Sequence, residues 1–204
     1  DVEELYAGIR LACQTYGVDI VGGDTTSSLT GLAISITAIG TAPKGTVVKR
    51  NGGKETDLIC VTGNLGAAYM GLQLLEREKS VYYQQVQEAK QRGNKNELAE
   101  LANFQPDFSG KEYLLQRQLN TEDISDGLSS ELMHICKQSN VGCRIFEKNL
   151  PIDYQTAVMA EEMNMNVTTC ALNGGEDYEL LFTVPIGDYS KIEGMQDVRL
   201  IGHI

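Results

Sequence analysis

Three short stretches of the sequence place a carboxylate beside glycine at the start or end of an apolar segment. They read GGDTTSS at residues 22–28, DISDGLSSEL at 123–132 and GGEDYELL at 174–181. Glycine lets the backbone approach a ligand closely, and a neighbouring carboxylate can bind a cation that prefers oxygen ligands. Mg²⁺ commonly binds through one or two carboxylates together with substrate phosphates and water. The three turns together therefore predict a site for magnesium and a phosphate group.

Each turn taken alone also has a purely structural interpretation. Ser125 or Asp126 could cap the helix expected after them, and GGDTTSS could be a polar turn with side-chain-to-backbone hydrogen bonds. GGEDYELL could be a solvent-exposed lead into a strand. Capping leaves Asp123 unexplained, and the free N–H groups at the helix start could bind a phosphate. The interpretation as a metal and phosphate site depends on all three turns.

A basic turn supplies the cations that a phosphate ligand would need. VVKRNGGKE contains Lys49, Arg50 and Lys54 around a glycine pair, in a chain with 28 acidic and 17 basic residues. Arginine can bond two phosphate oxygens at once. A basic loop that serves solubility is the alternative. The formal charge of -11 argues against nucleic acid and anionic membranes as partners.

Other kinds of site do not match the spacing of the residues. NGGKET lacks the first glycine and the Ser or Thr of a P-loop, and DISDGLSSELMH does not match an EF-hand loop. TGNLG does not fit a dinucleotide fingerprint, although Gly63 and Gly66 before a helix could contact an anion. The five cysteines form no Cys-x-x-Cys pair, so neither a disulfide framework nor a zinc site is expected. Free thiols and the lack of a long apolar run favour a cytoplasmic protein.

The elements that position these turns alternate between helices and strands. Three- and four-residue apolar spacing predicts helices over residues 2–16, 67–78, 128–136 and 152–164. Short apolar or alternating runs predict strands over residues 18–23, 29–43, 57–63, 141–147, 178–184 and 197–204. A polar helical stretch over about residues 80–120 is broken at RGN and QPDFSG. The order predicts an α/β or α+β layered fold with a domain boundary at APKG, so that residues 1–43 and 44–204 are separate domains.

The three acidic turns and KRNGGK together resemble the thiamine-monophosphate kinase family, which shares a superfamily with aminoimidazole ribonucleotide synthetase. GGDTT, DISDGL and GGEDYEL occur here in that family's order, and the last is the most telling for the kinase over its relatives. The resemblance covers nearly all of the chain. It implies a cytoplasmic homodimer that uses ATP and Mg²⁺ to phosphorylate thiamine monophosphate to thiamine diphosphate.

The resemblance also implies a role for each residue that matches the family's motifs. The acceptor is a phosphate oxygen that is largely deprotonated near neutral pH, so no residue is expected to act as a strong general base. The implied roles are nucleotide contacts by Gly23, Asp24, Arg50 and Ser125, magnesium ligation by Asp24, Asp123 and Asp126, and a substrate contact by Glu176.

The chain departs from that family in two respects. The family's amino-terminal half and carboxy-terminal tail have no counterpart here, so residues 1–43 would be the remnant of a dimer-forming, ATP-binding sheet domain. Residues 44–204 would be the mixed α/β domain of the aminoimidazole ribonucleotide synthetase type, and this piece alone is expected to be inactive. The polar helix also runs directly into DISDG, whereas the family has a longer insert and an apolar strand entry there, so a gap in the match is expected before Asp123. A sister ATP-dependent synthetase and a non-catalytic nucleotide-binding module stay open as alternatives.

Overall fold

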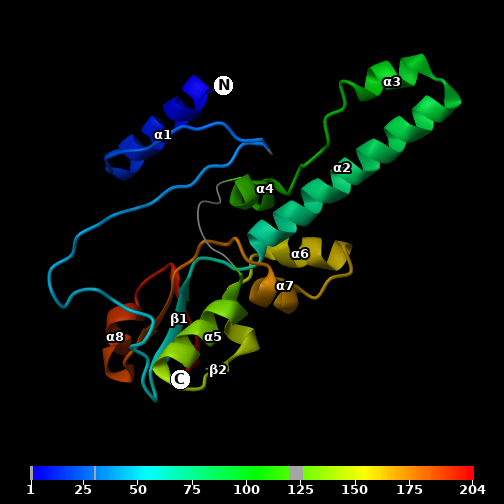
Figure 1. The fold of residues 1–204 in the computed structure, drawn as a ribbon. Coiled ribbons are helices and arrows are strands. Elements are labelled where there is room, and N and C mark those ends of the chain that lie inside the picture. Colours follow the sequence, from blue (N-terminus) through cyan, green and yellow to red (C-terminus); the bar gives the residue numbers. More distant parts are fainter. Residues whose placement is uncertain (1, 30, 120–125) are drawn as a thin grey trace. The chain divides into compact units, whose positions relative to one another are not determined.

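The computed structural model describes residues 2–29, 31–119 and 126–204, and Figure 1 draws it as a ribbon. The chain divides into two compact units, residues 1–46 and residues 47–204, which we call the N-terminal and C-terminal units. No helix in the described ranges has both the length and the apolar character that crossing a membrane requires.

The N-terminal unit begins with the helix that the sequence predicts. α1 spans Val2–Tyr16 and carries Glu3 and Glu4 in its first turn, where acidic side chains favour a helix. The helix ends at Gly17, which has a positive φ of 64°, and Val18 N donates to Cys13 O at 3.0 Å. The prediction of a helix over residues 2–16 is confirmed.

The two strands predicted in the N-terminal unit, over residues 18–23 and 29–43, are absent from its described part. These residues run in irregular or extended conformations, and Leu32 and Ile36 are each 81% exposed. A strand is stable only where a neighbour takes its backbone hydrogen bonds and covers its apolar face. The described residues of this unit offer one helix and no paired strand, so the alternating pattern has nothing to pack against. The prediction of strands was wrong here.

The C-terminal unit contains a four-stranded sheet with the strand order β2-β4-β1-β3. All three pairings are antiparallel, and β4 carries an irregularity opposite Ile59 and Cys60 of β1. The strands confirm four of the predicted positions, although β2 is only two residues long; they are β1 (Leu58–Thr62), β2 (Arg144–Ile145), β3 (Leu181–Val184) and β4 (Val198–His203). An antiparallel sheet with separate helices is the α+β form of the predicted layered fold.

Both faces of β1 are buried, which explains why the sequence of this strand is apolar throughout. Ile59 and Val61 face one side, where they pack in a cluster with Leu128 of α5 (Leu128–Ser139) and Ala171 of α7 (Val167–Asn173). Leu58 and Cys60 face the other side, towards Ile192 of α8 (Tyr189–Ile192). Successive side chains of a strand point to opposite faces, so a strand covered on both faces needs apolar residues without alternation.

A second cluster joins the remaining helices beside the sheet. The predicted polar helical stretch is confirmed with its two breaks, since it forms α2 (Ala67–Arg92), α3 (Lys95–Leu101) and α4 (Glu112–Leu119). In Figure 1, α2 extends away from the sheet and α3 lies beside its far end. The near end of α2 packs on α4 and on α6 (Tyr154–Glu162) through Met70, Leu114 and Met159. This packing places α4 next to the loop that follows α7.

Besides α8, three further short helical segments were not predicted from the sequence, namely α7 and two 3₁₀ turns. α7 is seven residues long and reads VTTCALN, in which β-branched residues weaken the helical signal. Its start is fixed by Asn166, whose side chain accepts from Thr169 N at 2.8 Å. The other two are 3₁₀ turns at Glu147–Asn149 and Ile186–Asp188.

Candidate active site

The start of α2 is capped by a carboxylate from the far end of the sequence. Asp177 accepts hydrogen bonds from Gly66 N at 2.6 Å and Ala68 N at 3.2 Å, and only 8% of its surface is exposed. These amides are among the N–H groups that a helix start leaves without an intrahelical partner. The sequence allowed Gly63 and Gly66 to contact an anion. The structure shows that Asp177 itself fills the anion position at Gly66.

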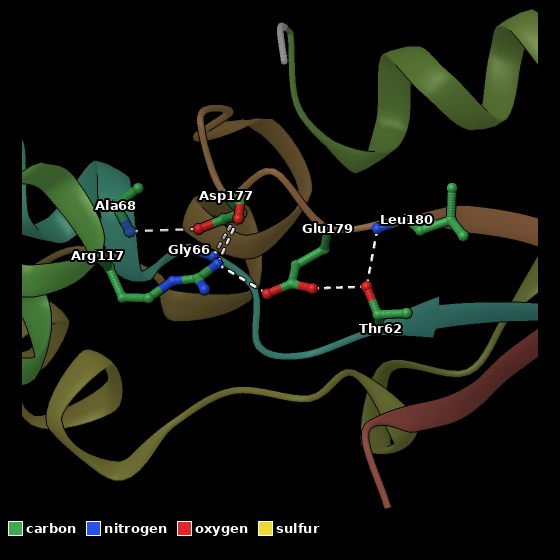
Figure 2. A network of polar contacts seen from close by, with 7 residues as sticks. All are labelled: Thr62, Gly66, Ala68, Arg117, Asp177, Glu179 and Leu180. Atoms are coloured by element: carbon green, nitrogen blue, oxygen red, sulfur yellow. Dashed lines mark hydrogen bonds and ion pairs between the residues drawn. The ribbon is translucent and has the colours of Figure 1, made fainter. Parts of the chain in front are cut away.

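Glu179 ties the same loop to the end of β1. Its Oε2 accepts from Thr62 Oγ1 at 2.6 Å, and Leu180 N donates to that Thr62 oxygen at 2.8 Å. Arg117 of α4 donates from Nη2 to Glu179 Oε1 at 2.9 Å, as Figure 2 shows. A Cβ on Gly63 would overlap the Glu179 carboxylate, so only glycine leaves room for this arrangement. Two of the three acids in GGEDYELL therefore have structural partners.

The backbone between these anchors takes a conformation that most residues avoid. Glu176 and Tyr178 have positive φ angles of 58° and 55°, and Gly175 before them has 69°. A non-glycine residue in this region costs about 1–2 kcal/mol. The result is that Asp177 points into the fold, whereas Glu176 is exposed and has no ion-pair partner within the described residues. We call residues 174–180 the acidic loop.

Burial changes the acid–base chemistry of the loop's buried carboxylate. Loss of water raises the pKa of Asp177 above its usual value of 3.8. The hydrogen bonds from Gly66 and Ala68 and the positive charge of Arg117 favour the carboxylate and oppose that rise, but they do not cancel it. A buried, hydrogen-bonded acid of this kind is fixed to the helix start and is not available as a metal ligand.

The start of α5 lies against the peptide that leads into the acidic loop. Gly127 has a φ of 91°, and a Cβ placed on it would lie 2.8 Å from Leu172 O and 2.9 Å from Asn173 Cα. Asp126, one residue earlier, is exposed. The structure therefore brings the turn that contains Asp126 to the same edge of the C-terminal unit as the turn that contains Glu176.

The basic turn is docked along α5. Arg50 Nη2 lies 3.3 Å from Glu131 Oε2 in the first turn of α5, and the Arg50 side chain is 56% exposed. At the other end of the helix, Ser139 Oγ donates to Arg50 O at 3.2 Å and accepts from Gly53 N at 3.1 Å. Arg50 is thus held on the helix whose first residue follows Asp126 and Gly127.

The other predicted site residues lie either in the N-terminal unit or outside the described residues. Gly23 and Asp24 are exposed in the N-terminal unit, where Asp24 Oδ1 accepts from Thr25 N at 2.8 Å. That bond joins adjacent residues, whereas an Asx turn bonds the backbone two residues further on. Asp123 and Ser125 lie outside the described residues.

The described residues contain no preformed metal cluster. Within residues 2–29, 31–119 and 126–204, no group of three His, Cys, Asp or Glu side chains is placed to hold a metal ion. Mg²⁺ needs only one or two carboxylates when substrate phosphates and waters complete its shell. The exposed oxygens of Asp126 fit such a ligand, whereas those of Asp177 and Glu179 are bonded within the fold.

A small hollow of about 240 Å³ opens next to the first residue of the acidic loop. Tyr69, Met165 and Cys170 line it together with Gly174. The hollow is large enough for a ring-sized group and adjoins the loop that carries Glu176.

Sequence reasoning did not find the residues that hold the acidic loop. GGEDYELL offers Glu176, Asp177 and Glu179 alike as possible ligands, and it does not point to Arg117 or Thr62. The two glycines before α2 carried a usable signal, because a helix start without a capping side chain of its own needs an acceptor from elsewhere. Arg117 is the basic residue of α4, but its place in EYLLQRQL does not show that it contacts the acidic loop.

The N-terminal unit matches a known protein family. Residues 1–42 match the family described as AIR synthase related protein, N-terminal domain. Curated relatives match over most of the chain. The chain is 33% identical over 200 residues to the thiamine-monophosphate kinase of Aquifex aeolicus (strain VF5), which covers 97% of this chain and 61% of the relative. It is 32% identical over 185 residues to that of Bacillus subtilis (strain 168), covering 90% and 54%.

Solved structures also match this chain over nearly its whole length. AaThiL complexed with AMPPCP and TMP matches with a TM-score of 0.70 at 26% identity, covering 99% of this chain and 61% of that chain. A HypE-HypF complex matches with a TM-score of 0.58 at 20% identity, covering 100% and 66%, which shows likeness of fold alone. This chain thus spans less than two thirds of the length of the first relatives named here.

The fold and these matches define the class, which is a mixed α/β protein of the AIR synthase-related type. Within that class, the chain is related in sequence and fold to the thiamine-monophosphate kinases. The fold class and the family resemblance that the acidic turns indicated are both confirmed.

Proposed function

We propose that this chain takes part in the ATP- and Mg²⁺-dependent phosphorylation of thiamine monophosphate to thiamine diphosphate. The observation that carries the proposal is the acidic loop, in which two carboxylates are fixed within the fold and Glu176 is left exposed. This loop occurs in a chain related to thiamine-monophosphate kinases over nearly all of its length. The complex of AaThiL with AMPPCP, an ATP analogue, and TMP supports ATP and thiamine monophosphate as the two ligands.

Arg50 is the proposed cation at the nucleotide phosphates. The Arg50 side chain is 56% exposed beside Glu131, so more than half of it is open to a ligand. Bidentate bonding to phosphate oxygens would neutralise charge that develops during transfer. Gly23, Asp24 and Ser125 are proposed as further nucleotide contacts.

Asp126 is the proposed magnesium ligand in the described part of the C-terminal unit, together with Asp24 and Asp123 by family resemblance. When bound, the metal would neutralise charge on the transferring phosphoryl group. Gly127 packs against Leu172 and Asn173, just before the acidic loop, which supports the proposal that Asp126 and Glu176 serve neighbouring parts of one ligand.

Glu176 is proposed to face the substrate because thiamine monophosphate carries a cationic ring. An exposed carboxylate without an ion-pair partner in the described ranges attracts such a ring. The acceptor oxygen is already largely deprotonated near neutral pH, so the chain can do without a strong base and has two histidines in all. We therefore propose direct in-line transfer without a phosphorylated residue, in which alignment and charge neutralisation lower the barrier.

The remaining proposals concern assembly and location. Residues 1–43 would belong to an ATP-binding domain that forms a homodimer in the cytoplasm, and residues 44–204 to the second domain. The chain spans 61% of the length of the Aquifex relative.

The test is ADP release in the longest natural form of this chain, measured with thiamine monophosphate and with the acceptors of the sister synthetases. We expect release only with thiamine monophosphate, and a loss of about 100-fold or more in kcat for Asp126→Asn with the fold retained. ADP release with another acceptor would favour a sister synthetase. Binding of Mg-ATP without turnover would favour a nucleotide-binding module.

A further inference from the structure

One guanidinium outside the acidic loop bridges two points within it. Arg117 lies on α4, and its Nη2 donates both to the backbone carbonyl of Asp177 and to Glu179 Oε1, the latter at 2.9 Å. Figure 2 shows both bonds converging on this nitrogen. The two acceptors lie on either side of Tyr178, whose φ is 55°. Arg117 therefore closes the part of the loop in which the backbone is least favourable.

We propose that Arg117 is a positioning residue that keeps Glu176 directed towards a cationic substrate. The proposal rests on the proposed function and adds a residue to it. Backbone outliers such as Glu176 and Tyr178 persist only where surrounding contacts hold them. Directly after Glu176, the Asp177 carboxylate is bonded to the start of α2. Arg117 then holds the Asp177 carbonyl and the Glu179 carboxylate. Without Arg117 the loop can relax towards ordinary φ angles and turn Glu176 away.

The charges around the loop support the same role. The Arg117 side chain is 26% exposed and that of Glu179 is 13% exposed, so their attraction is screened less than that of a surface pair. Arg117 already donates to the Asp177 carbonyl and to the Glu179 carboxylate, and it donates to neither oxygen of Glu176. Glu176 therefore keeps its negative charge for the ligand, while Arg117 keeps the neighbouring acids in place.

Hydrogen exchange tests whether Arg117 holds the loop. We expect Arg117→Met to speed exchange of the amides at residues 175–180 roughly tenfold or more, with the amides of β1 unchanged. Arg77→Met is the matched control, because Arg77 also pairs with carboxylates, Glu78 and Glu162, but away from the loop. Exchange in the loop at the wild-type rate in Arg117→Met would overturn the proposal.

Steady-state kinetics on the longest natural form of the chain test the positioning of Glu176. Arg117→Met should raise KM for thiamine monophosphate roughly tenfold, with KM for ATP within about twofold of wild type. The KM of Arg117→Lys for thiamine monophosphate should lie between those of wild type and Arg117→Met, since an ammonium can still donate to one or both acceptors. An equal rise in both KM values would indicate general loss of structure and overturn the positioning role.

Loss of the cation could prevent folding, because Glu179 would keep a half-buried charge without its partner. The double variant Arg117→Met with Glu179→Gln removes both charges and lets the amide oxygen still accept from Thr62. Faster exchange in the acidic loop of this variant supports the proposal, and a wild-type rate overturns it. If wild type shows no turnover with thiamine monophosphate, the proposed function fails, while the exchange rates still decide whether Arg117 holds the loop.

Discussion

Each of the two units contains a stretch that predicts a strand, but the two stretches have different outcomes. DLICVTG and LTGLAISITAIG both predict strands, but only the first forms one, as β1. β1 lies between β3 and β4, and helices cover both of its faces. The described part of residues 17–46 contains no paired strand, and its apolar side chains remain exposed. An alternating pattern tells which side chains share a face, but a strand also needs a partner.

The acidic turns differ in the same way. Asp24 accepts from the next residue, Thr25, and both are exposed. Asp177 accepts from Gly66 and Ala68, which come from a different part of the sequence and start a different element. A local bond shapes only its own turn, whereas a long-range bond fixes one element against another.

The largest difference is expected for isoleucines in the two predicted strands. Ile59 is fully buried in β1, so Ile59→Ala should lower the free energy of unfolding by about 2–5 kcal/mol. Ile36 is 81% exposed, and Ile36→Ala should change it by no more than about 0.5 kcal/mol. Urea denaturation followed by circular dichroism measures both. A comparable loss for Ile36→Ala would mean that this side chain packs against something.

Two helix glycines should respond with opposite signs. A Cβ on Gly71 of α2 would overlap the carbonyl of Leu114 in α4, so Gly71→Ala should destabilise by about 1–3 kcal/mol despite the helix preference of alanine. Gly8 of α1 has nothing within 4 Å of an added Cβ, so Gly8→Ala should favour helix by about 0.5–1 kcal/mol. Thermal unfolding for Gly71→Ala and helix content for Gly8→Ala are the measurements. Stabilisation by Gly71→Ala would contradict the close packing of α2 on α4.

The buried acid should give the C-terminal unit a distinct pH dependence. Because the pKa of Asp177 is raised in the folded state, the folded protein binds this proton more tightly than the unfolded chain. The contribution of the protonated Asp177 to stability is fully present below the pKa that this carboxyl has in the unfolded chain. It is lost as the pH rises through the pKa that the carboxyl has in the folded protein. The stability of wild type relative to Asp177→Asn should therefore fall as pH rises above about 4, with a slope of at most about 1.4 kcal/mol per pH unit.

Urea unfolding of both proteins between pH 4 and 7 measures this difference. Asp24→Asn is the control in the N-terminal unit and should change stability by no more than about 0.5 kcal/mol. A difference that rises with pH would show that the hydrogen bonds at Gly66 and Ala68, and not burial, dominate at Asp177.

The smallest effect concerns the reactivity of a thiol in the C-terminal unit. Cys143 is exposed as a residue, but reduced hydration of its thiol and a hydrogen bond with Cys136 raise the pKa of Cys143 to about 11. Only about one thiol in a thousand would be ionised at pH 8, so alkylation should be slow and should rise about tenfold per pH unit to pH 10. Mass spectrometry after iodoacetamide treatment gives the rate. Cys136→Ser should speed it, and fast labelling at pH 7 would contradict the assignment.

The sequence predicts those parts of the fold that depend on local signals. Gly93 and the QPDFSG stretch mark the breaks between α2, α3 and α4, and regular apolar spacing marks α1 and α5. α7 was not predicted because its seven residues are too few to show a helical period of apolar residues. The pairing order β2-β4-β1-β3 could not be predicted, since it joins segments that are distant in the sequence.

The candidate site was predictable to a different extent. Motif types and order pointed to Arg50, Asp126 and Glu176, and the structure places all three on or beside α5 and the acidic loop. Their roles at a ligand stay predictions. The division of labour within GGEDYELL was not predictable, because Asp177 and Glu179 differ from Glu176 only in their distant partners, Gly66, Thr62 and Arg117.

The position of β4 in the sheet has a consequence for biosynthesis. β4 follows the other three strands in the sequence, yet it lies inside the sheet, bonded to both β1 and β2. While the ribosome is still translating the region before residue 198, β1 has already emerged with one edge unoccupied. Such an edge can pair with other chains. Nascent C-terminal units must therefore be shielded, or remain collapsed and incomplete, until residues 198–203 leave the exit tunnel.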